Sequence, residues 1–375
     1  KGGAFLKVKG GRVGFRKKII KIMIQQIKSK LAAFHYAVSK KEKKIRPVWF
    51  FLLFLFFASC QEEEKKTIVC WGDSLTAPHQ ETLKQKIRGI FVEDHDYPSV
   101  LQKILGDDYE VINCGVGGEN TLTIMGRQGA YPLILAHDVT INSKDCGLEN
   151  FMGNTDVPAF LSSYNNEVCY PLLQHKSSAK INDCMIQGGT YELSAESKIW
   201  RVGDGYGKAY NYFITPKIPS DKQIVLKKGS RIQTYAMSHL RNAYCNIIFM
   251  GENGGFKDVK DLIRQINLMI AYSKSDRYIV IGFHKYNNVI STHKRMVEME
   301  DSLSMAFGSH YLCIRKHLVK EGLKEAGMTA TKADLDSMRI GVVPSQLLVD
   351  GIHFTSKGYD IIGKLVAMKM KELEY

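Results

Sequence analysis

The stretch TIVCWGDSLT, residues 67–76, decides the fold that we expect for this chain of 375 residues. Its apolar run from Thr67 to Trp71 predicts a short buried strand, and Gly72 then permits a tight turn. In open α/β folds ligands bind at the carboxyl edge of the sheet, where such a turn would place Ser74. Ser74 is therefore a candidate nucleophile, with a helix N-cap as the alternative interpretation.

Strands and helices alternate downstream of this stretch in two blocks. The first block predicts helices over residues 81–91 and 97–105, a strand over 109–113 and a helical stretch over 118–126. The second predicts strands over 246–250, 278–283 and 310–314, and helices over 259–270, 291–307, 318–326, 332–338 and 356–373. This alternation predicts an α/β fold, in which helices cover both faces of a parallel sheet.

The intervening residues 131–239 differ in character from both blocks. Helical periodicity fades there, and β-rich runs at 200–203, 210–215 and 224–226 are separated by turn residues. We therefore expect a small antiparallel β domain inserted into one loop of the α/β domain.

Two glycine-rich blocks stand where strands are expected to end. In NCGVGGENT, residues 113–121, the glycines let backbone N–H groups approach a ligand, although the third glycine of a dinucleotide fingerprint is missing. In MGENGG, residues 250–255, Asn253 offers a side-chain amide donor. A simple turn is the alternative interpretation of each block.

A fourth block, DGIHF at residues 350–354, precedes the final expected helix. Its spacing around a glycine turn can place the Asp350 carboxylate on one nitrogen of His353 and leave the other nitrogen facing the sheet edge. His353 is therefore the candidate base among 11 histidines. His95, between Asp94 and Asp96, is the competitor, which we interpret as a solvated loop residue or a weak metal site.

Taken in order, the four blocks resemble those of the SGNH or GDSL-type hydrolases, a flavodoxin-like α/β/α esterase family. The resemblance covers residues 67–130 and 240–375. It implies a catalytic triad and an oxyanion hole: Ser74, His353 and Asp350 in the first, and the N–H groups of Ser74 and Gly118 with the side chain of Asn253 in the second. It implies no metal and no organic cofactor.

Two features depart from the family pattern. Its third block usually reads Gly-x-Asn-Asp, and Gly254 stands here in place of the aspartate that often helps to orient the asparagine. The stretch 131–239 is longer than the usual connection. It resembles the β insert of some exported bacterial and gut-associated members, where it would overhang the cleft.

The resemblance implies a serine esterase that hydrolyses acyl esters through an acyl-enzyme. Acetyl esters of carbohydrates or small molecules are the favoured substrates, because many family members remove acetyl groups from carbohydrate. An O-acyltransferase, a lipase or a lysophospholipase would use the same site. The alternative of a different class is a glycan-binding surface lipoprotein with a vestigial site, and the intact Ser74, Asn253, Asp350 and His353 argue against it.

The N-terminal part of the chain is expected to direct export rather than to join the fold. A basic run at 40–46 precedes mostly apolar residues 48–59, which would span about 18 Å as a helix, too short for a bilayer core of about 30 Å. Small residues then precede Cys60, which resembles a bacterial lipoprotein cleavage site. The implied product is a bacterial lipoprotein anchored through a lipid on Cys60, in the periplasm or on the outer-membrane surface.

The expected organisation follows from these boundaries. An upstream segment and signal peptide would occupy residues 1–59, and a tether would occupy 60–66. The hydrolase domain would comprise 67–130 and 240–375, on either side of the β insert at 131–239. Residues 1–39 fit no signal peptide, and Met23 is an internal candidate start.

The basic charge of the chain is confined to the N-terminal part. The formal net charge is +14. Residues 1–47 hold 15 Lys and Arg and a single acid, Glu42, so the rest of the chain is neutral overall. A neutral folded portion offers no electrostatic footprint for a phosphate backbone, which argues against nucleic-acid binding.

Seven cysteines follow Cys60. Those in expected core strands, where a buried free thiol is the favoured state, are Cys70, Cys114 and Cys245. Cys146, Cys169 and Cys184 lie close together, and one pair among them is a candidate disulfide in an exported protein. No C-x-x-C pair indicates a metal site.

Overall fold

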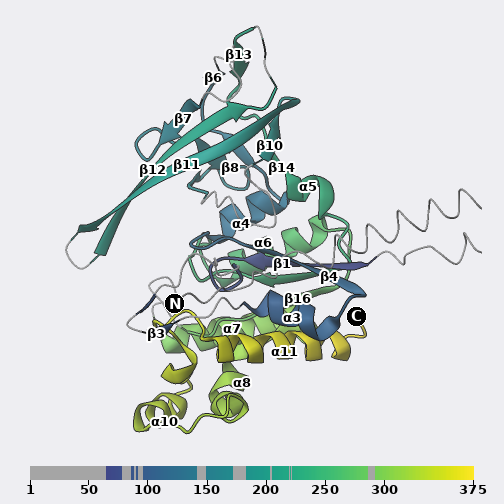
Figure 1. Ribbon diagram of the computed structural model, residues 1–375, viewed down its shortest axis with the longest axis vertical. Helices are drawn as coiled ribbons and strands as arrows, with labels where there is room; N and C mark the ends of the chain where they lie inside the picture. The colour runs from purple at the N-terminus through teal and green to yellow at the C-terminus, as the bar shows by residue number, and fades with distance from the viewer. Residues whose placement is uncertain are drawn as a thin grey trace, which may run out of the picture. The chain divides into compact units, whose positions relative to one another are not determined.

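The computed structural model describes residues 65–77, 86–87, 90–91, 96–141, 149–171, 183–202, 205–218, 220, 222–285 and 292–375 (Figure 1). The chain divides into two units, Lys1–Glu64 and Lys65–Tyr375, and the described residues all belong to the second. The expected signal peptide and Cys60 therefore lie outside the described residues. Within these residues, every helix is too short or too polar to cross a membrane.

A parallel five-stranded sheet forms the centre of the second unit. Its order is β17-β16-β15-β1-β4, where the strands are β1 (Lys66–Gly72), β4 (Tyr109–Gly115), β15 (Cys245–Phe249), β16 (Tyr278–Ile281) and β17 (Tyr311–Leu312). Counted along the chain and read from β4, this order is 2-1-3-4-5, one of the two common arrangements of doubly wound sheets. Strand β1 pairs with β4 on one side and β15 on the other, so the topological switch point lies beside it.

Both faces of this sheet are buried, as the apolar runs in the sequence predict. Along β1, Val69 and Trp71 belong to one hydrophobic core, and Ile68 and Cys70 belong to a second core on the opposite face. Successive side chains of a strand point to opposite faces, so a continuous apolar run fits a sheet covered on both sides.

Helices cover the sheet on each face. The first core contains residues of α4 (Thr121–Gln128), α6 (Val259–Tyr272) and α7 (His293–Phe307). The second contains residues of α3 (Tyr97–Leu105) and α11 (Ser356–Glu372). Figure 1 shows α4 and α6 on one side of the sheet and α3 and α11 on the other. The structure therefore confirms an α/β fold with a parallel sheet.

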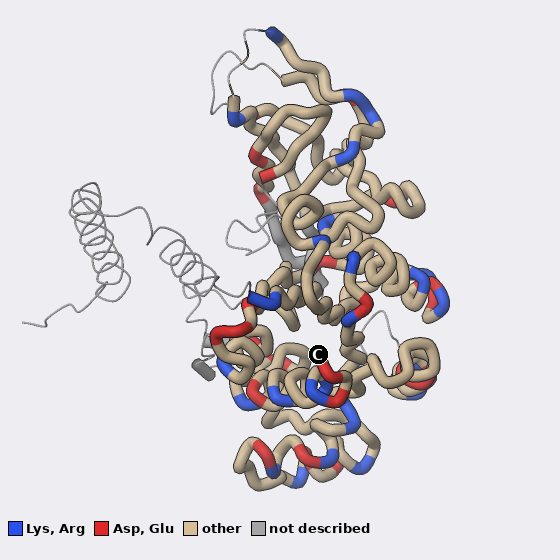
Figure 2. Tube along the Cα trace, turned by 90° about the vertical axis from the view of Figure 1, so that its right-hand side faces the viewer, with Lys and Arg blue, Asp and Glu red and all other residues tan. Residues whose placement is uncertain are grey.

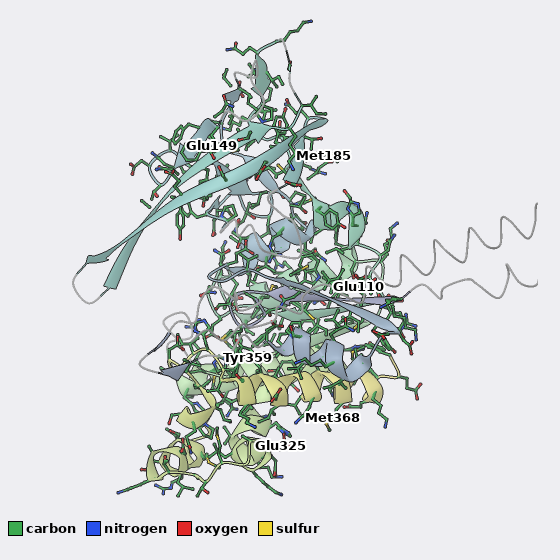
Figure 3. The ribbon with its side chains drawn as sticks, viewed as in Figure 1. Glu110, Glu149, Met185, Glu325, Tyr359 and Met368 are labelled. Atoms are coloured by element: carbon green, nitrogen blue, oxygen red, sulfur yellow. The ribbon has the colours of Figure 1, made fainter. Side chains whose placement is uncertain are left out.

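The closing helix α11 illustrates how amphipathic periodicity sets this packing. Tyr359 is buried and its ring contacts Phe354 edge-on, whereas Met368 further along α11 is exposed (Figure 3). Thr355 caps the N-terminus of α11 by accepting a hydrogen bond from the Gly358 N–H.

Short helical elements complete the α/β part. They are α5 (Tyr235–His239), the 3₁₀ helix η1 (Gly308–His310), α8 (Ile314–His317), the π-helical turn η2 (Leu318–Gly322), α9 (Leu323–Glu325), α10 (Lys332–Arg339) and the 3₁₀ helix η3 (Ser345–Leu347).

Residues 131–239, called the β-rich stretch below, form three antiparallel sheets among the described residues. The largest has the order β14-β10-β11-β12-β7, with β7 (Asn150–Asn154), β10 (Asp183–Ile186), β11 (Gly189–Val202), β12 (Gly205–Pro216) and β14 (Gln233–Thr234). The others are β5-β8-β9 and β13-β6, with β5 (Leu133–Leu135), β6 (Val139–Ile141), β8 (Phe160–Ser162), β9 (Val168–Cys169) and β13 (Ile224–Leu226). Strands β11 and β12 form a long ribbon that extends beyond the other strands (Figure 1).

The β-rich stretch shares its hydrophobic core with the α/β part. Phe160 and Tyr212 of the β-rich stretch belong to the same cluster as Met125 of α4 and Ile266 of α6. The two parts are therefore continuous through buried side chains.

Two expectations for local structure are corrected. The helix expected over 81–91 is absent at its described positions, where β2 (Lys86–Ile87) pairs antiparallel with β3 (Ile90–Phe91). Isoleucines on either side of Gly89 favour extended chain over helix. Helix α4 begins at Thr121 rather than at Gly118, because Gly118 has a φ of +80° and Asn120 caps the helix.

The cysteines that the structure describes are free. Cys70, Cys114 and Cys245 are free and buried, as expected for core strands. Cys169 and Cys184 are also free and buried, so no disulfide joins them, and Cys146 lies outside the described residues.

Charges of both signs are distributed over the surface. In the view of Figure 2, Lys and Arg alternate with Asp and Glu along the helices of the α/β part.

Candidate active site

Ser74, His353 and Asp350 form a chain of hydrogen bonds beyond the carboxyl end of β1. Ser74 Oγ lies 2.9 Å from His353 Nε2, and His353 Nδ1 lies 2.8 Å from Asp350 Oδ2. With its proton on Nδ1, His353 donates to Asp350 and accepts from the Ser74 hydroxyl. The structure thus brings together the three residues that the sequence nominated for a triad.

The loop that carries Ser74 is wound around Asp73. The Asp73 carbonyl accepts hydrogen bonds from the N–H groups of Thr76 (3.1 Å) and Ala77 (2.8 Å), and its side chain accepts from the Leu75 N–H (2.9 Å). At Gly72 an added Cβ would lie 2.5 Å from the carbonyl oxygen of Phe249. Only glycine fits there, because the backbone of β15 lies so close to the end of β1.

The turn that carries the acid and the base is equally constrained. Asp350 Oδ1 accepts from the N–H groups of Ile352 (3.0 Å) and His353 (2.8 Å), across Gly351 with a φ of +86°. Lys285 Nζ, just after β16, donates to the Gly351 carbonyl at 2.7 Å. These bonds hold the carboxylate of Asp350 toward the imidazole.

The charge state of Asp350 follows from the same contacts. Burial opposes its ionisation, but the N–H and side chain of His353 and the N–H of Ile352 outweigh burial and lower the pKa of Asp350. Asp350 is therefore an anion near neutral pH, as a partner for an imidazolium must be.

Two backbone donors expected for an oxyanion hole are unengaged. Neither the Ser74 N–H nor the Gly118 N–H makes a hydrogen bond to another described residue. Gly118 is exposed and has a φ of +80°, a conformation that favours glycine. Both groups can therefore donate to a bound ligand.

The third expected donor, Asn253, is held from two sides. Its Nδ2 donates to Asp73 Oδ2 at 3.2 Å and to the carbonyl oxygen of Glu119 at 3.1 Å. Asp73 adjoins Ser74 and Glu119 adjoins Gly118, so Asn253 joins the two loops that carry the other expected donors.

The absence of an aspartate at position 254 is explained by the local backbone. Gly254 has a φ of +74°, donates its N–H to the Gly251 carbonyl and accepts from the Thr121 N–H at the start of α4. The sequence raised doubt about what orients Asn253, and the structure assigns that role to Asp73 and Glu119. Their positions next to Ser74 and Gly118 were the available signal, and sequence reasoning missed them.

Buried acids surround this group of donors. Burial, with smaller contributions from Glu252 and Glu119, raises the pKa of Asp73 to about 7, against the opposing effect of the Leu75 N–H. Burial also raises the pKa of Glu119, although its ion pair with Arg127 opposes the shift. Arg127 is therefore a buried cation that offsets negative charge beside these acids.

A second histidine lies beneath the turn that carries the acid and the base. His284 is fully buried just after β16, and its ring centroid lies 4.5 Å from that of Phe354. Burial, with a smaller contribution from the nearby charge of Lys285, lowers the pKa of His284 to about 3, against the opposing effect of the Ile352 backbone. His284 is therefore neutral near pH 7 and acts as packing for the turn.

The described residues contain no group of three or more His, Cys, Asp and Glu arranged to hold a metal ion. His95, the weak metal candidate of the sequence, lies outside the described residues.

Comparisons with known proteins add little to this geometry. No protein-family model matches the chain, and no curated protein matches it. Ten solved chains match it. One of them, a crystal structure, is 11% identical with a TM-score of 0.35, and the match covers 83% of this chain and 99% of that chain. This degree of likeness bears on neither fold nor function.

Proposed function

We propose that this protein is a serine esterase of the SGNH or GDSL type that hydrolyses acyl esters of carbohydrates or small molecules, with acetyl esters favoured. The observation that carries the proposal is the hydrogen-bonded array of Ser74, His353 and Asp350 beside the switch point of the sheet. Such a nucleophile, base and orienting acid within hydrogen-bond reach defines the serine hydrolase mechanism.

The reaction starts at the serine. Ser74 Oγ attacks the ester carbonyl carbon while its proton passes to His353 Nε2, and Asp350 stabilises the resulting imidazolium. The bond to the alcohol oxygen then breaks, and the alcohol leaves with the proton from His353. Water, deprotonated by the same imidazole, attacks the acyl-enzyme and releases the acid.

The donors at the strand ends would stabilise the negative charge of the tetrahedral intermediate by hydrogen bonding. The N–H groups of Ser74 and Gly118 are available for it. The side chain of Asn253 contributes once one of its two bonds, to Asp73 or to Glu119, is shared with the oxyanion. Each such donor is typically worth about 3–4 kcal/mol of the barrier.

The substrate class rests on the resemblance to family members that remove acetyl groups from carbohydrate. The lipid anchor belongs to the same proposal and rests on the sequence of residues 40–60. If Cys60 is lipidated, Cys60→Ala will move the protein from the membrane fraction to the soluble fraction. A protein that remains in the membrane fraction would exclude this anchor.

Hydrolysis of p-nitrophenyl acetate and p-nitrophenyl octanoate by the protein tests the reaction. We expect turnover of the acetate well above that of the octanoate, and loss of both in Ser74→Ala. Release of acetate from an acetylated sugar then tests the alcohol moiety. Preference for octanoate would favour lipid substrates, and failure of the folded protein on all three esters would exclude the hydrolase.

A further inference from the structure

A buried arginine connects the two loops that carry the proposed oxyanion donors. Arg127, in the last turn of α4, is 3% exposed and Glu119 is 2% exposed. Arg127 Nε and Nη2 each lie 3.0 Å from Glu119 Oε2, and Nη2 also donates to the Gly72 carbonyl at 3.4 Å. The guanidinium lies over the ring of Trp71 in β1.

Both partners of Arg127 are close to the reacting atoms in sequence and in space. Gly72 precedes the nucleophile Ser74 by two residues. Glu119 follows Gly118 directly, and its carbonyl accepts one of the two bonds of Asn253. The Arg127 side chain therefore links the end of β1 to the loop after β4.

The β-rich stretch closes over this ion pair. Helix α4 contacts β1, β5 and β8, and Figure 1 shows it between β1 and β8. Thr234 Oγ1 of β14 donates to the Arg127 carbonyl at 2.8 Å. A cavity of about 20 Å³ lies between Glu119, Arg127 and the β-rich side chains, which include Leu133, Phe160, Leu193 and Ile232.

Burial has two consequences for the pair. The attraction between the two charges is strong because solvent screens them little. A side chain that is buried, paired and hydrogen-bonded on two sides also has little freedom to move. The pair can therefore fix the positions of the atoms to which it is bonded.

We infer that Arg127 is a positioning residue for the oxyanion hole: its buried pair with Glu119, sealed by the β-rich stretch, holds the Gly118 N–H and Asn253 in place relative to Ser74. This inference rests on the proposed esterase function. It assigns the β-rich stretch a role in the chemical step as well as any role in substrate selection.

The test must separate positioning from stability. Arg127→Met alone leaves Glu119 buried without its partner, which is strongly destabilising. The double variant Arg127→Met/Glu119→Gln leaves no lone charge and is the variant to measure. Replacement of a whole buried ion pair by neutral side chains is often tolerated.

The chain offers a matched control in a second buried pair. Arg315 Nε donates to Glu300 Oε1 at 2.7 Å, and Nη1 donates to the Gly341 carbonyl at 2.6 Å. Arg315 is 5% exposed and Glu300 1% exposed, and neither contacts Ser74, Gly118 or Asn253 in the bonds described. Arg315→Met/Glu300→Gln removes the same chemistry away from the site.

For hydrolysis of p-nitrophenyl acetate, we expect kcat to fall about 10²-fold in Arg127→Met/Glu119→Gln, with KM almost unchanged, because oxyanion donors act in the transition state. The control pair should keep its kcat at comparable stability in urea. Arg127→Lys should recover part of the rate, because it keeps a cation but not the planar fork. Equal kcat losses in both double variants, or no loss in the first, would overturn the inference.

A second measurement does not depend on activity. Hydrogen exchange of the backbone over residues 113–120 should be faster in Arg127→Met/Glu119→Gln than in the wild type and in the control pair. If the wild type turns over no ester, the proposed function has failed, and this comparison still shows whether the pair holds the loop after β4 in place. Unchanged exchange over 113–120 would overturn the inference.

Discussion

His353 Nε2 lies 2.9 Å from Ser74 Oγ, although 279 positions separate the two residues in the chain. Ser74 follows the central strand β1, whereas His353 lies in the last turn before α11. Contacts of α11 with α3 and with β16 return the end of the chain to the carboxyl edge of the sheet. The proposed chemistry therefore depends on the whole α/β fold, and its parts can be tested one by one.

Asp350→Asn tests the orienting acid. The substitution preserves size but removes the charge that stabilises an imidazolium and the acceptor that selects the tautomer of His353. We expect kcat for p-nitrophenyl acetate to fall by roughly 10³-fold or more with the fold retained. Asp107→Asn, at an exposed loop position, is the control and should keep the wild-type rate. Near-normal turnover by Asp350→Asn would exclude the assigned role.

Asn253→Ala tests the side-chain donor. The expected loss is about 10²–10³-fold in kcat with little change in KM, since the donor acts on charge that develops in the transition state. Asn253 is exposed, so the free energy of unfolding should change by only about 1 kcal/mol. A rise in KM at constant kcat would show instead that Asn253 binds the ground state of the substrate.

Gly72→Ala tests the turn before the nucleophile. The added Cβ would lie 2.5 Å from the backbone carbonyl oxygen of Phe249, which cannot move without disturbing β15. We expect a loss of roughly 2–3 kcal/mol in the free energy of unfolding, measured in urea. Gly188→Ala is the comparison, because its Cβ would meet no atom within 4 Å and only its φ of +81° is unfavourable. That change should cost about 1–2 kcal/mol, and an equal or larger cost than at Gly72 would contradict the steric account.

The buried carboxyl of Asp73 predicts a dependence of stability on pH. Burial raises its pKa from 3.8 to about 7, so the folded state retains a proton that the unfolded state loses above about pH 4. The stabilising contribution is complete below pH 3.8 and is lost as the pH rises through about 7. It amounts to about 4 kcal/mol at most.

Urea denaturation of the wild type and Asp73→Asn at pH 4.5 and pH 8 measures this contribution. The other titrating groups are common to both proteins and cancel in the difference. Relative to the wild type, the variant should gain several kcal/mol between pH 4.5 and pH 8. A difference in stability that stays constant across this range would show that Asp73 ionises normally.

Much of the fold was predictable because its signals are local. The apolar run at Thr67–Trp71 and the helical spacing over 259–270 became β1 and α6, since both periodicities are written in neighbouring residues. The prediction of a helix over 81–91 was wrong at 86–87 and 90–91, where β2 pairs with β3 despite the helical spacing of the sequence. Pairing of that kind is invisible to a single-helix pattern.

The residues of the candidate site also divide into those with a local sequence signal and those defined by contacts between distant segments. Ser74, Asn253, Asp350 and His353 were found because each stands beside a strand end or a glycine turn, which is a local mark. Asp73, Glu119 and Arg127 were missed because their importance lies in contacts with other segments. The bond from Asn253 to Asp73 spans 180 positions, and the bond from Arg127 to Gly72 spans 55.

The sequence by itself therefore determined the alternating elements and the residue types offered at the ends of the strands. Only the tertiary structure decided which of those residues come into contact, and which acids and histidines are buried. Hydrogen-bond geometry and the pKa of a buried group depend on atoms brought together from distant segments. A linear pattern can nominate Ser74 and His353, but the packing of α11 and the order of the sheet place them 2.9 Å apart.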